Sequence, residues 1–342
     1  MKPFKTTSLD IAARAGVSQS TVSRALRNSP QVSAETRRQI QRIAREMGYT
    51  VDRNASRLRA KTTSTLALLL CEDEIESHIN PFFLSILSSV AHAAAGHGYD
   101  LLVTFQQLSE NWVMDFQDAH RADGLILLGI RDRESYDAQL VGLEASGTPL
   151  VIWCLEHHVP GVSSYLTCQN QESARELTSH LIRLKHRHFA FVGVTSTANP
   201  EFTHRYEGYL EALASHGIET DPGLHISANS SETEGYDAVE ALLANGRKVD
   251  AIVCASDLIA IGAMAALHDR GLDVPGDMAV VGYDDLPIAQ HTRPALTTVR
   301  QDTELAGRKL AEHLIHLIDG QDVQPEELPV TLMIRQSCGA RD

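Results

Sequence analysis

The chain has 342 residues, of which 43% are hydrophobic, so it can form globular cores and is long enough for more than one domain. Its formal net charge is −14, from 30 basic and 44 acidic side chains. The first residues carry no signal peptide and no apolar stretch reaches the roughly 20 residues of a membrane span, so we expect a cytoplasmic protein without a membrane partner.

The charge is divided unevenly along the chain. Residues 1–61 hold 13 basic and 4 acidic side chains, a net charge of +9, whereas the remaining 17 basic and 40 acidic side chains give −23. A basic head on an acidic body is typical of a nucleic-acid-binding module, because its cations must offset the charge of the phosphates.

Two short helices separated by a tight turn are predicted at the start of this head. Ser8 is a good N-cap for the first helix, Gly16 permits the turn, and Ser18 can cap the second helix. The apolar side chains at helical spacing are Leu9, Ile11, Ala12 and Ala15, then Val22, Ala25 and Leu26. Each helix is too short to be stable alone, so we expect the two to pack against each other.

The second helix points short polar side chains and one guanidinium away from its apolar stripe. They are Gln19, Ser20, Thr21, Ser23 and Arg24. Such groups suit base edges and phosphates in a major groove. An ordinary helical hairpin with a polar surface has the same spacing, and spacing alone leaves both interpretations open. The basic charge favours DNA binding.

A third helix over residues 34–47 completes the predicted all-α head. Ser33 can cap it, and Gly48 can end it. Its apolar stripe is Ile40, Ile43, Ala44 and Met47. Residues 50–61 follow as a basic linker, whose composition alone indicates a solvated tether.

Residues 6–59 resemble the DNA-binding headpiece of the LacI/GalR family of bacterial repressors. The matching motifs are Thr7-Ser8-Leu9-Asp10-Ile11-Ala12, Gly16-Val17-Ser18, Thr21-Val22-Ser23-Arg24, Val32-Ser33 and Gly48-Tyr49. The resemblance implies double-stranded operator DNA as the partner. The DNA-contacting residues that it implies are Thr7, Ser18, Gln19, Ser20, Thr21, Ser23, Arg24, Asn28, Ser33, Ala55 and Leu58.

The linker of this family folds into a short hinge helix on operator DNA. Leu58 matches the leucine that the family inserts into the minor groove, where an apolar wedge unstacks a base step and kinks the duplex. The family usually has Pro-Asn at the start of the linker, and this chain has Val51-Asp52.

From Thr65 onward, short apolar runs alternate with amphipathic helical segments. The runs are Leu66–Leu70, Asp100–Thr104, Gly124–Leu128, Pro149–Trp153, Phe189–Gly193, Asp250–Cys254 and Ala279–Gly282. The helical segments lie near residues 82–97, 136–146, 171–185, 204–216, 233–245, 257–270 and 303–318. This alternation predicts parallel sheets covered on both faces, and a section of about 280 residues favours two α/β lobes. Ligands of such folds bind outside the carboxyl ends of the strands.

This body resembles the two-lobed, periplasmic-binding-protein-like effector domain of the same family. The matching motifs are Asn80-Pro81-Phe82-Phe83, Ala122-Asp123-Gly124-Leu125-Ile126, His180-Leu181, His186-Arg187, Arg205-Tyr206-Glu207-Gly208, Ala255-Ser256-Asp257, Val281-Gly282-Tyr283-Asp284-Asp285 and Leu296-Thr297-Thr298-Val299. The resemblance predicts three crossings between lobes, near residues 165, 298 and 326. The expected domains are a helix-turn-helix domain (1–50), a hinge (51–61) and an effector-binding and dimerisation domain (62–342). Lobe 1 is expected at about 62–165 and 298–326, and lobe 2 at about 166–297 and 327–342.

The resemblance also implies a ligand site in the cleft between the lobes. Its predicted residues are Phe82, Phe83, Cys154, Arg205, Ser256 and Asp284. Arg205, expected to open a helix, can donate a fork of hydrogen bonds, and Asp284 can accept from vicinal hydroxyls. From the sequence alone, a surface arginine and a turn-forming Asp-Asp pair are open alternatives. Phe83 offers an apolar face to a ring, but a Phe at helical spacing is more often a core residue.

The cleft departs from the family pattern at three positions. Cys154 stands where sugar-responsive members often carry Asp, Ser256 where many carry Asn, and Gln169 where Asp usually precedes Asn170. The cleft is therefore less acidic than a typical sugar site. A carbohydrate or sugar derivative is still the favoured small-molecule effector.

The sequence predicts no metal, no cofactor and no catalytic residues. The histidines of His157-His158 and His186-Arg187-His188 lack an acid or cysteine at ligand spacing, and no GxGxxG, P-loop or GxSxG motif occurs. The five cysteines are widely spaced without a CxxC pair, which is typical of free thiols in a reducing compartment.

We therefore predict a ligand-responsive transcriptional regulator, with repression as the favoured mode, that is not an enzyme. A homodimer follows because one recognition helix reads about one half-site of a palindromic operator. The chain ends soon after the apolar run Val330–Arg335, so no tetramerisation helix is expected. The alternative is a cytoplasmic small-molecule-binding protein or enzyme with a basic N-terminal extension.

Overall fold

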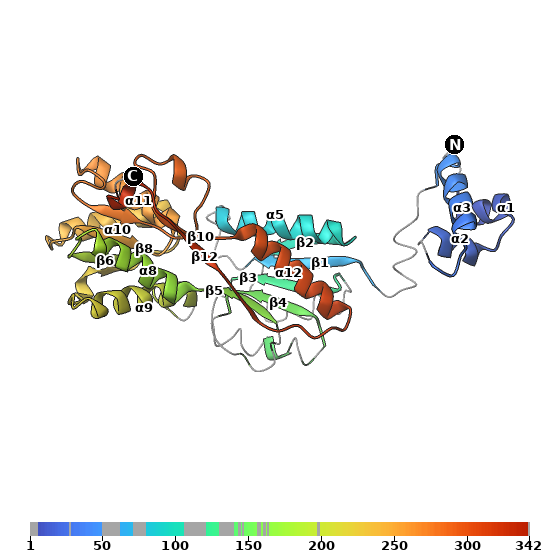
Figure 1. Cartoon of the computed structure of the whole chain (residues 1–342), viewed down its shortest axis with the longest axis horizontal. Helices are drawn as coiled ribbons and strands as arrows, with labels where there is room; N and C mark the ends of the chain where they lie inside the picture. The colour runs from blue at the N-terminus through green and yellow to red at the C-terminus, as the bar shows by residue number, and fades with distance from the viewer. Residues whose placement is uncertain are drawn as a thin grey trace. The chain divides into compact units, whose positions relative to one another are not determined.

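The computed structural model of the chain describes its residues in twelve segments (Figure 1). They are 6–26, 29–49, 62–70, 80–105, 121–129, 140–142, 145, 147–155, 159, 162, 164–196 and 199–340. The chain divides into two compact units, Met1–Thr63 and Ser64–Asp342.

In the described residues of the first unit, three helices pack around one small core, which confirms the predicted all-α head. These are α1 (Ser8–Ala15), α2 (Gln19–Leu26) and α3 (Ala34–Glu46). The buried core residues are Ile11, Ala12, Val22, Ala25, Val32, Ile40, Ile43 and Ala44. Apart from Val32, all of them belong to the predicted stripes, and the stripe residues Ala15, Leu26 and Met47 pack against this core partly buried. Leu9 is the stripe residue that does not join the core. Leu9 is 62% exposed, because it lies two residues before Ile11 and so points toward the opposite side of the helix.

The N-cap of α1 is Thr7 and not Ser8, which corrects the prediction by one residue. The Thr7 hydroxyl accepts from the Asp10 backbone N–H, and the Asp10 carboxylate accepts from the Thr7 backbone N–H at 2.8 Å, which together form a capping box. Ser18 and Ser33 cap as predicted, since each hydroxyl accepts from the backbone N–H three residues later, that of Thr21 and Thr36.

The second unit contains a six-stranded parallel sheet in the order β11-β5-β4-β3-β1-β2. The strands are β1 (Thr65–Leu70), β2 (Asp100–Phe105), β3 (Gly124–Leu128), β4 (Leu150–Trp153), β5 (Tyr165–Cys168) and β11 (Glu326–Leu328). Helices α5 (Pro81–Gly96) and α12 (Thr303–Ile318) pack together on one face (Figure 1). Leu66 and Leu68 of β1 join their core, whereas Ala67 and Leu69 join a second core on the other face. Burial of both faces explains why β1 is a continuous apolar run.

A four-stranded parallel sheet in the order β7-β6-β8-β9 forms a second lobe. Its strands are β6 (Phe189–Val192), β7 (His225–Ile226), β8 (Ala251–Cys254) and β9 (Ala279–Val281). Four helices accompany it, α8 (Asn170–Arg183) packed on α9 (Pro200–Ser215) and α10 (Glu232–Ala244) packed on α11 (Asp257–Asp269). Gly208 lets α9 approach α8 closely, because a Cβ there would collide with the Gln171 carbonyl oxygen.

The chain crosses between the two sheets at three places. The first lies between β5 and α8, the second runs through β10 (Thr298–Gln301) into α12, and the third lies between β11 and β12 (Val330–Met333). Strands β10 and β12 pair antiparallel with each other. Because β5 continues to Cys168 and β11 to Leu328, the first and third crossings fall slightly later than the predicted residues 165 and 326.

Several elements differ from the sequence-based expectation. The strands β5, β7, β10 and β11 were not predicted, since they are short and partly polar and pair only in the tertiary structure, whereas β12 lies within the apolar run Val330–Arg335. Helix α9 begins at Pro200, a favoured first helical residue, so Arg205 lies in its second turn and does not open the helix. The helix predicted over residues 136–146 falls largely outside the described residues. No helix in the described part of the chain is long and apolar enough to cross a membrane.

Candidate functional site

The exposed face of α2 carries the side chains predicted to contact DNA. Ser18, Gln19, Ser20 and Arg24 are exposed, and Thr21 and Ser23 are half-buried. The Gln19 side-chain amide donates to the Ser8 hydroxyl at 2.9 Å, which ties the start of α2 to α1. A polar, cationic face of this kind can contact phosphates and base edges.

Thr7 and Ser33 lie at the N-termini of α1 and α3. Both are exposed caps, and a phosphate near either residue would also meet the positive end of a helix. The other predicted DNA contacts, Asn28, Ala55 and Leu58, lie outside the described residues and stay predictions from the sequence.

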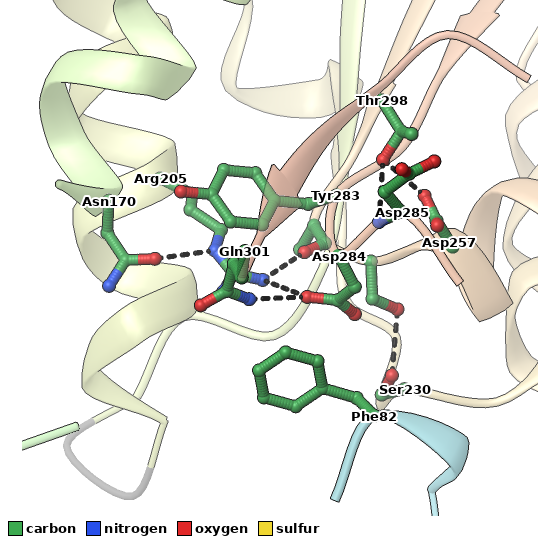
Figure 2. Close-up of polar contacts among 12 residues, drawn as sticks. Phe82, Asn170, Arg205, Ser230, Asp257, Tyr283, Asp284, Asp285, Thr298 and Gln301 are labelled. Carbon is green, nitrogen blue, oxygen red and sulfur yellow. Dashed lines mark hydrogen bonds and ion pairs between the residues drawn. The ribbon is translucent and has the colours of Figure 1, made fainter. Parts of the chain in front are cut away.

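Arg205 is the centre of a buried polar cluster in the second unit (Figure 2). Its Nε donates to Asn170 Oδ1 at 2.9 Å, and its Nη1 donates to the Ala255 carbonyl oxygen at 2.6 Å. Its guanidinium also stacks 3.6 Å above the centroid of the Tyr283 ring. Arg205 is therefore no surface arginine, and the alternative left open by the sequence is wrong.

Asp284 is the buried counter-charge of Arg205. Its Oδ1 lies 3.7 Å from Arg205 Nη1 and accepts from Gln301 Nε2 at 2.7 Å. Burial raises the pKa of Asp284 to about 7, although Arg205 and Gln301 both act to lower it. Burial alone would lower the pKa of Arg205, but the Asp284 carboxylate raises it. The pair thus sets a fixed cation beside a carboxyl group that can change its charge near neutral pH.

Gln301 completes this cluster and was missed by the sequence analysis. Its side chain is 4% exposed, and its Oε1 has no hydrogen-bond partner among the described residues. A buried acceptor without a donor is costly, so a ligand N–H or O–H at this position would stabilise it. The available signal was its place on the second crossing, two residues after the Leu296–Val299 motif.

The predicted aromatic pair divides between the core and its edge. Phe82 is buried in the core of the first sheet, where its ring centroid lies 6.2 Å from that of Trp153, while Phe83 is half-buried beside it at 5.5 Å. Cys154 is buried in the same core. Its sulfur lies 4.0 Å from the Asn170 side-chain amide, so Asn170 links Cys154 to Arg205.

Ser256 is the N-cap of α11, and its hydroxyl makes hydrogen bonds both to this helix and to Ser230 before α10. Its hydroxyl accepts from the Ile259 backbone N–H and from the Ser230 hydroxyl, the latter at 2.7 Å. Ser230 in turn accepts from the Asn80 side-chain amide at 3.3 Å. Because Asn80 caps α5, this chain of hydrogen bonds joins the N-termini of α5 and α11.

Asp257, the next residue, is a buried carboxylate that organises the loop after β9. Its two oxygens accept from the Leu286 backbone N–H at 2.7 Å and from the Thr298 hydroxyl at 2.6 Å. Burial and the nearby Asp284 raise the pKa of Asp257 well above its ordinary value.

A separate pocket of about 440 Å³ lies beside this cluster. It is lined by Cys168, Gln169, Asn170, Gln171, Glu172, Arg175, His204, Glu211 and Glu327. It shares Asn170 with the Arg205 cluster, but Arg205, Asp284 and Gln301 do not line it. We place the candidate ligand site at the Arg205 cluster, because buried donors and an unsatisfied acceptor converge there.

In the part of the chain that the structure describes, no group of three or more His, Cys, Asp or Glu side chains is arranged so that it could hold a metal ion. His186 contacts the Asp250 carboxylate at 3.6 Å, just before β8, and the Cys338 carbonyl oxygen at 3.3 Å, which links it to the C-terminal segment.

Comparison with known proteins gives matches along nearly the whole chain. The model of bacterial regulatory proteins of the lacI family matches residues 7–52, and that of a periplasmic binding protein-like domain matches residues 178–338. The transcriptional regulator CelR of Thermobifida fusca is 33% identical over 96% of both chains. AscG of Escherichia coli K12, also a transcriptional regulator, is 31% identical over 97% of both.

Solved structures agree with this result. The lac repressor dimer, bound to operator and the anti-inducer ONPF, aligns with a TM-score of 0.83 at 26% identity, covering 98% of this chain and all of that one. A complex of CelR with cellobiose aligns with a TM-score of 0.73 at 31% identity, covering 97% of this chain and all of that one.

Proposed function

Because the chain belongs to the LacI family of bacterial transcriptional regulators, we propose that it represses transcription as a homodimer on a palindromic operator. A sugar or sugar derivative, bound at Arg205 and Asp284, changes the affinity for that operator. The site of action is the cytoplasm, where the operator DNA is.

The DNA-binding part of this proposal rests on the first unit. Its net charge of +9 can neutralise several phosphates, and the exposed side chains of α2 can enter a major groove. A dimer gives two such helices related by a two-fold axis, which suits a palindrome. The lac repressor, a structural relative, binds its operator as a dimer.

The effector part rests on one observation, the unsatisfied buried Oε1 of Gln301 beside the Arg205–Asp284 pair. A carboxylate and an amide oxygen accept hydrogen bonds, and a guanidinium donates them, so the three groups together suit neighbouring hydroxyls. Hydroxyls of a sugar ring both donate and accept. Since the relative CelR forms a complex with cellobiose, a disaccharide of glucose is the first effector to test.

The dimer surface that we infer is the open edge of the six-stranded sheet. Strand β2 is its edge strand, and Val103 and Phe105 on it are 40% and 52% exposed, beside α5 with the exposed Leu84. An apolar edge strand invites pairing with another chain, and a second copy of this chain supplies that partner.

A gel shift with DNA from the region upstream of the gene tests this function directly. We expect specific retardation that changes on addition of cellobiose or another sugar of a small panel. Binding without any sequence preference would contradict the regulator. A change in the sugar itself during incubation would favour the enzyme alternative, although CelR and AscG are regulators.

A further inference from the structure

The loop after β9 holds two consecutive aspartates in unusual backbone conformations. The φ angle is 117° at Asp284 and 55° at Asp285. Residues other than glycine rarely adopt positive φ, and such strain persists only where the surroundings enforce it. Since Asp284 is the proposed effector ligand, the contacts that enforce this turn bear on effector binding.

Asp285 is fixed by two arginines. Its Oδ2 accepts from Arg300 Nε and its Oδ1 from Arg335 Nη2, both at 2.6 Å. The Asp285 side chain is 6% exposed, against 50% for Arg300 and 15% for Arg335. Both are charge-assisted bonds, and burial of the carboxylate shields them from solvent.

The two arginines come from two different crossings between the lobes. Arg300 lies on β10, the second crossing, and Arg335 lies just after β12, the third crossing. Within the antiparallel pair that these strands form, Arg300 is opposite Thr331. Arg335 also donates from Nη1 to the Leu296 carbonyl oxygen at 2.7 Å, just before β10. Asp285 therefore joins both crossings at one carboxylate.

Asp284 makes hydrogen bonds to β10, the strand that also carries Arg300. Its backbone N–H donates to the Val299 carbonyl oxygen at 2.8 Å, and its carboxylate accepts from Gln301. Figure 2 shows the Asp284 carboxylate directed toward Arg205 and Gln301, with Asp285 beyond it near Thr298. A rotation of β10 therefore moves Asp284, through its hydrogen bonds to Val299 and Gln301. It also moves Asp285, through the hydrogen bond from Arg300.

We propose that Asp285 is a positioning residue that couples the effector-binding carboxylate of Asp284 to the β10 and β12 crossings. It makes no contact with Arg205 and need not touch the effector. The inference rests on the proposed role of Asp284. A change in the angle between the lobes moves the strands that cross between them. The two hydrogen bonds that Asp285 accepts from Arg300 and Arg335 therefore link this angle to effector affinity.

The test variant is Asp285→Asn in the full-length protein. Asn is isosteric with Asp and tolerates the left-handed region, so the turn can form, but the amide is uncharged and offers a single acceptor oxygen. The matched control is Glu240→Gln, which removes the charge that pairs with Arg270 between α10 and α11. This pair is also an acid–arginine contact, but it lies away from the crossings.

The first measurement needs no effector. Hydrogen exchange followed by mass spectrometry should show about tenfold faster exchange of the Asp284 and Leu286 amides and of residues 298–301 in Asp285→Asn. Exchange in β6 and β8 should stay as in the wild type, and Glu240→Gln should leave all these segments unchanged. Wild-type exchange rates in residues 284–286 and 298–301 of the variant would overturn the proposal. Faster exchange throughout the second sheet would also overturn it, since that indicates a general loss of stability.

The second measurement is calorimetry with cellobiose. Asp285→Asn should weaken cellobiose binding at least about tenfold while the melting temperature stays close to that of Glu240→Gln. Equal affinity in wild type and Asp285→Asn would overturn the positioning role. If the wild type binds no cellobiose, the proposed effector is wrong, and the exchange measurement still decides the role of Asp285. Arg300→Gln and Arg335→Gln should each give part of the exchange effect, because each removes one of the two bonds.

Discussion

Arg205 and Tyr283 stack with 3.6 Å between the guanidinium carbon and the ring centroid, and both side chains are buried. The Tyr283 hydroxyl is bonded to the Ser173 hydroxyl at 2.6 Å, which holds the ring in place. The ring covers one face of the guanidinium, so Arg205 can donate to a ligand only in the plane of its fork. The arrangement orients the donors before a ligand arrives.

Replacing Arg205 should therefore remove effector binding. Arg205→Lys keeps the charge but loses the planar fork, and we expect sugar affinity to fall at least about tenfold with operator binding retained. Arg205→Ala should also destabilise the protein, by about 1–3 kcal/mol, because it leaves the buried Asn170 and Ala255 oxygens without their donor, while Asp284 takes up a proton. Calorimetry and thermal melting measure the two effects. Equal sugar affinity in wild type and Arg205→Lys would mean that the cleft is misplaced.

Effector affinity should rise with pH because the ionised carboxylate of Asp284 accepts from a sugar hydroxyl much more strongly than the neutral carboxyl group does. Burial raises the pKa of Asp284 to about 7, so the ionised fraction, and with it the affinity, falls about tenfold between pH 8 and pH 6. Calorimetry at several pH values checks this. Asp284→Asn should bind more weakly and show no such dependence, and a wild-type affinity that does not vary with pH would contradict the assignment.

The same group should affect the stability of the protein in the opposite sense. Its folded-state pKa lies above the ordinary value of 3.8, so protonation favours the folded state. The contribution of Asp284 to the free energy of unfolding is full below about pH 4 and is lost as the pH rises to about 7. Denaturant unfolding of wild type and Asp284→Asn across this range measures the contribution of Asp284 to the free energy of unfolding. The comparison separates it from the contribution of Asp257, whose raised pKa acts in the same direction.

DNA binding should weaken steeply as salt increases, because a headpiece of net charge +9 releases counterions from the phosphates. Arg24→Ala, on the exposed face of α2, should reduce specific affinity by at least about tenfold. Arg183→Ala, an exposed arginine in the second unit, is the control and should bind normally. Salt titrations by fluorescence anisotropy give both results. Salt-insensitive binding, or a normal Arg24→Ala protein, would count against the proposed interface.

The linker prediction concerns Leu58, which lies outside the described residues. Leu58→Ala should abolish the minor-groove wedge, so DNA bending and specific affinity both fall while non-specific binding is kept. The folded headpiece should be unaffected, which circular dichroism can verify. Unchanged bending in a circular-permutation assay would refute the wedge.

Val103→Lys tests the inferred dimer edge. A lysine on the exposed edge strand β2 opposes pairing by charge and hydration, so the dimer should dissociate at higher protein concentration than the wild type. Sedimentation velocity measures the shift, and operator affinity should fall with it. Glu240→Gln again serves as a surface control. A Val103→Lys dimer as tight as the wild type would place the interface elsewhere.

Local sequence was sufficient to predict the headpiece and most of the parallel strands. The helices of the head are set by caps and apolar stripes that act over fewer than about fifteen residues. Even the one-residue error at α1 was avoidable, since Thr7 followed by Asp10 is the spacing of a capping box. Buried parallel strands such as β1 are continuous apolar runs for a physical reason, because both faces of the sheet are covered.

Only the tertiary structure decided how the candidate site is assembled. Asn170, Ala255 and Asp284 surround Arg205 from three separate segments, and no local pattern around Arg205 encodes those partners. Gln301 is polar and sits on a short strand that pairs with β12 only after the chain has crossed between lobes. Its oxygen is unsatisfied because burial removes water while the described residues supply no donor. Sequence therefore determined which residues are helical, apolar or charged, and long-range packing determined which charges are buried together.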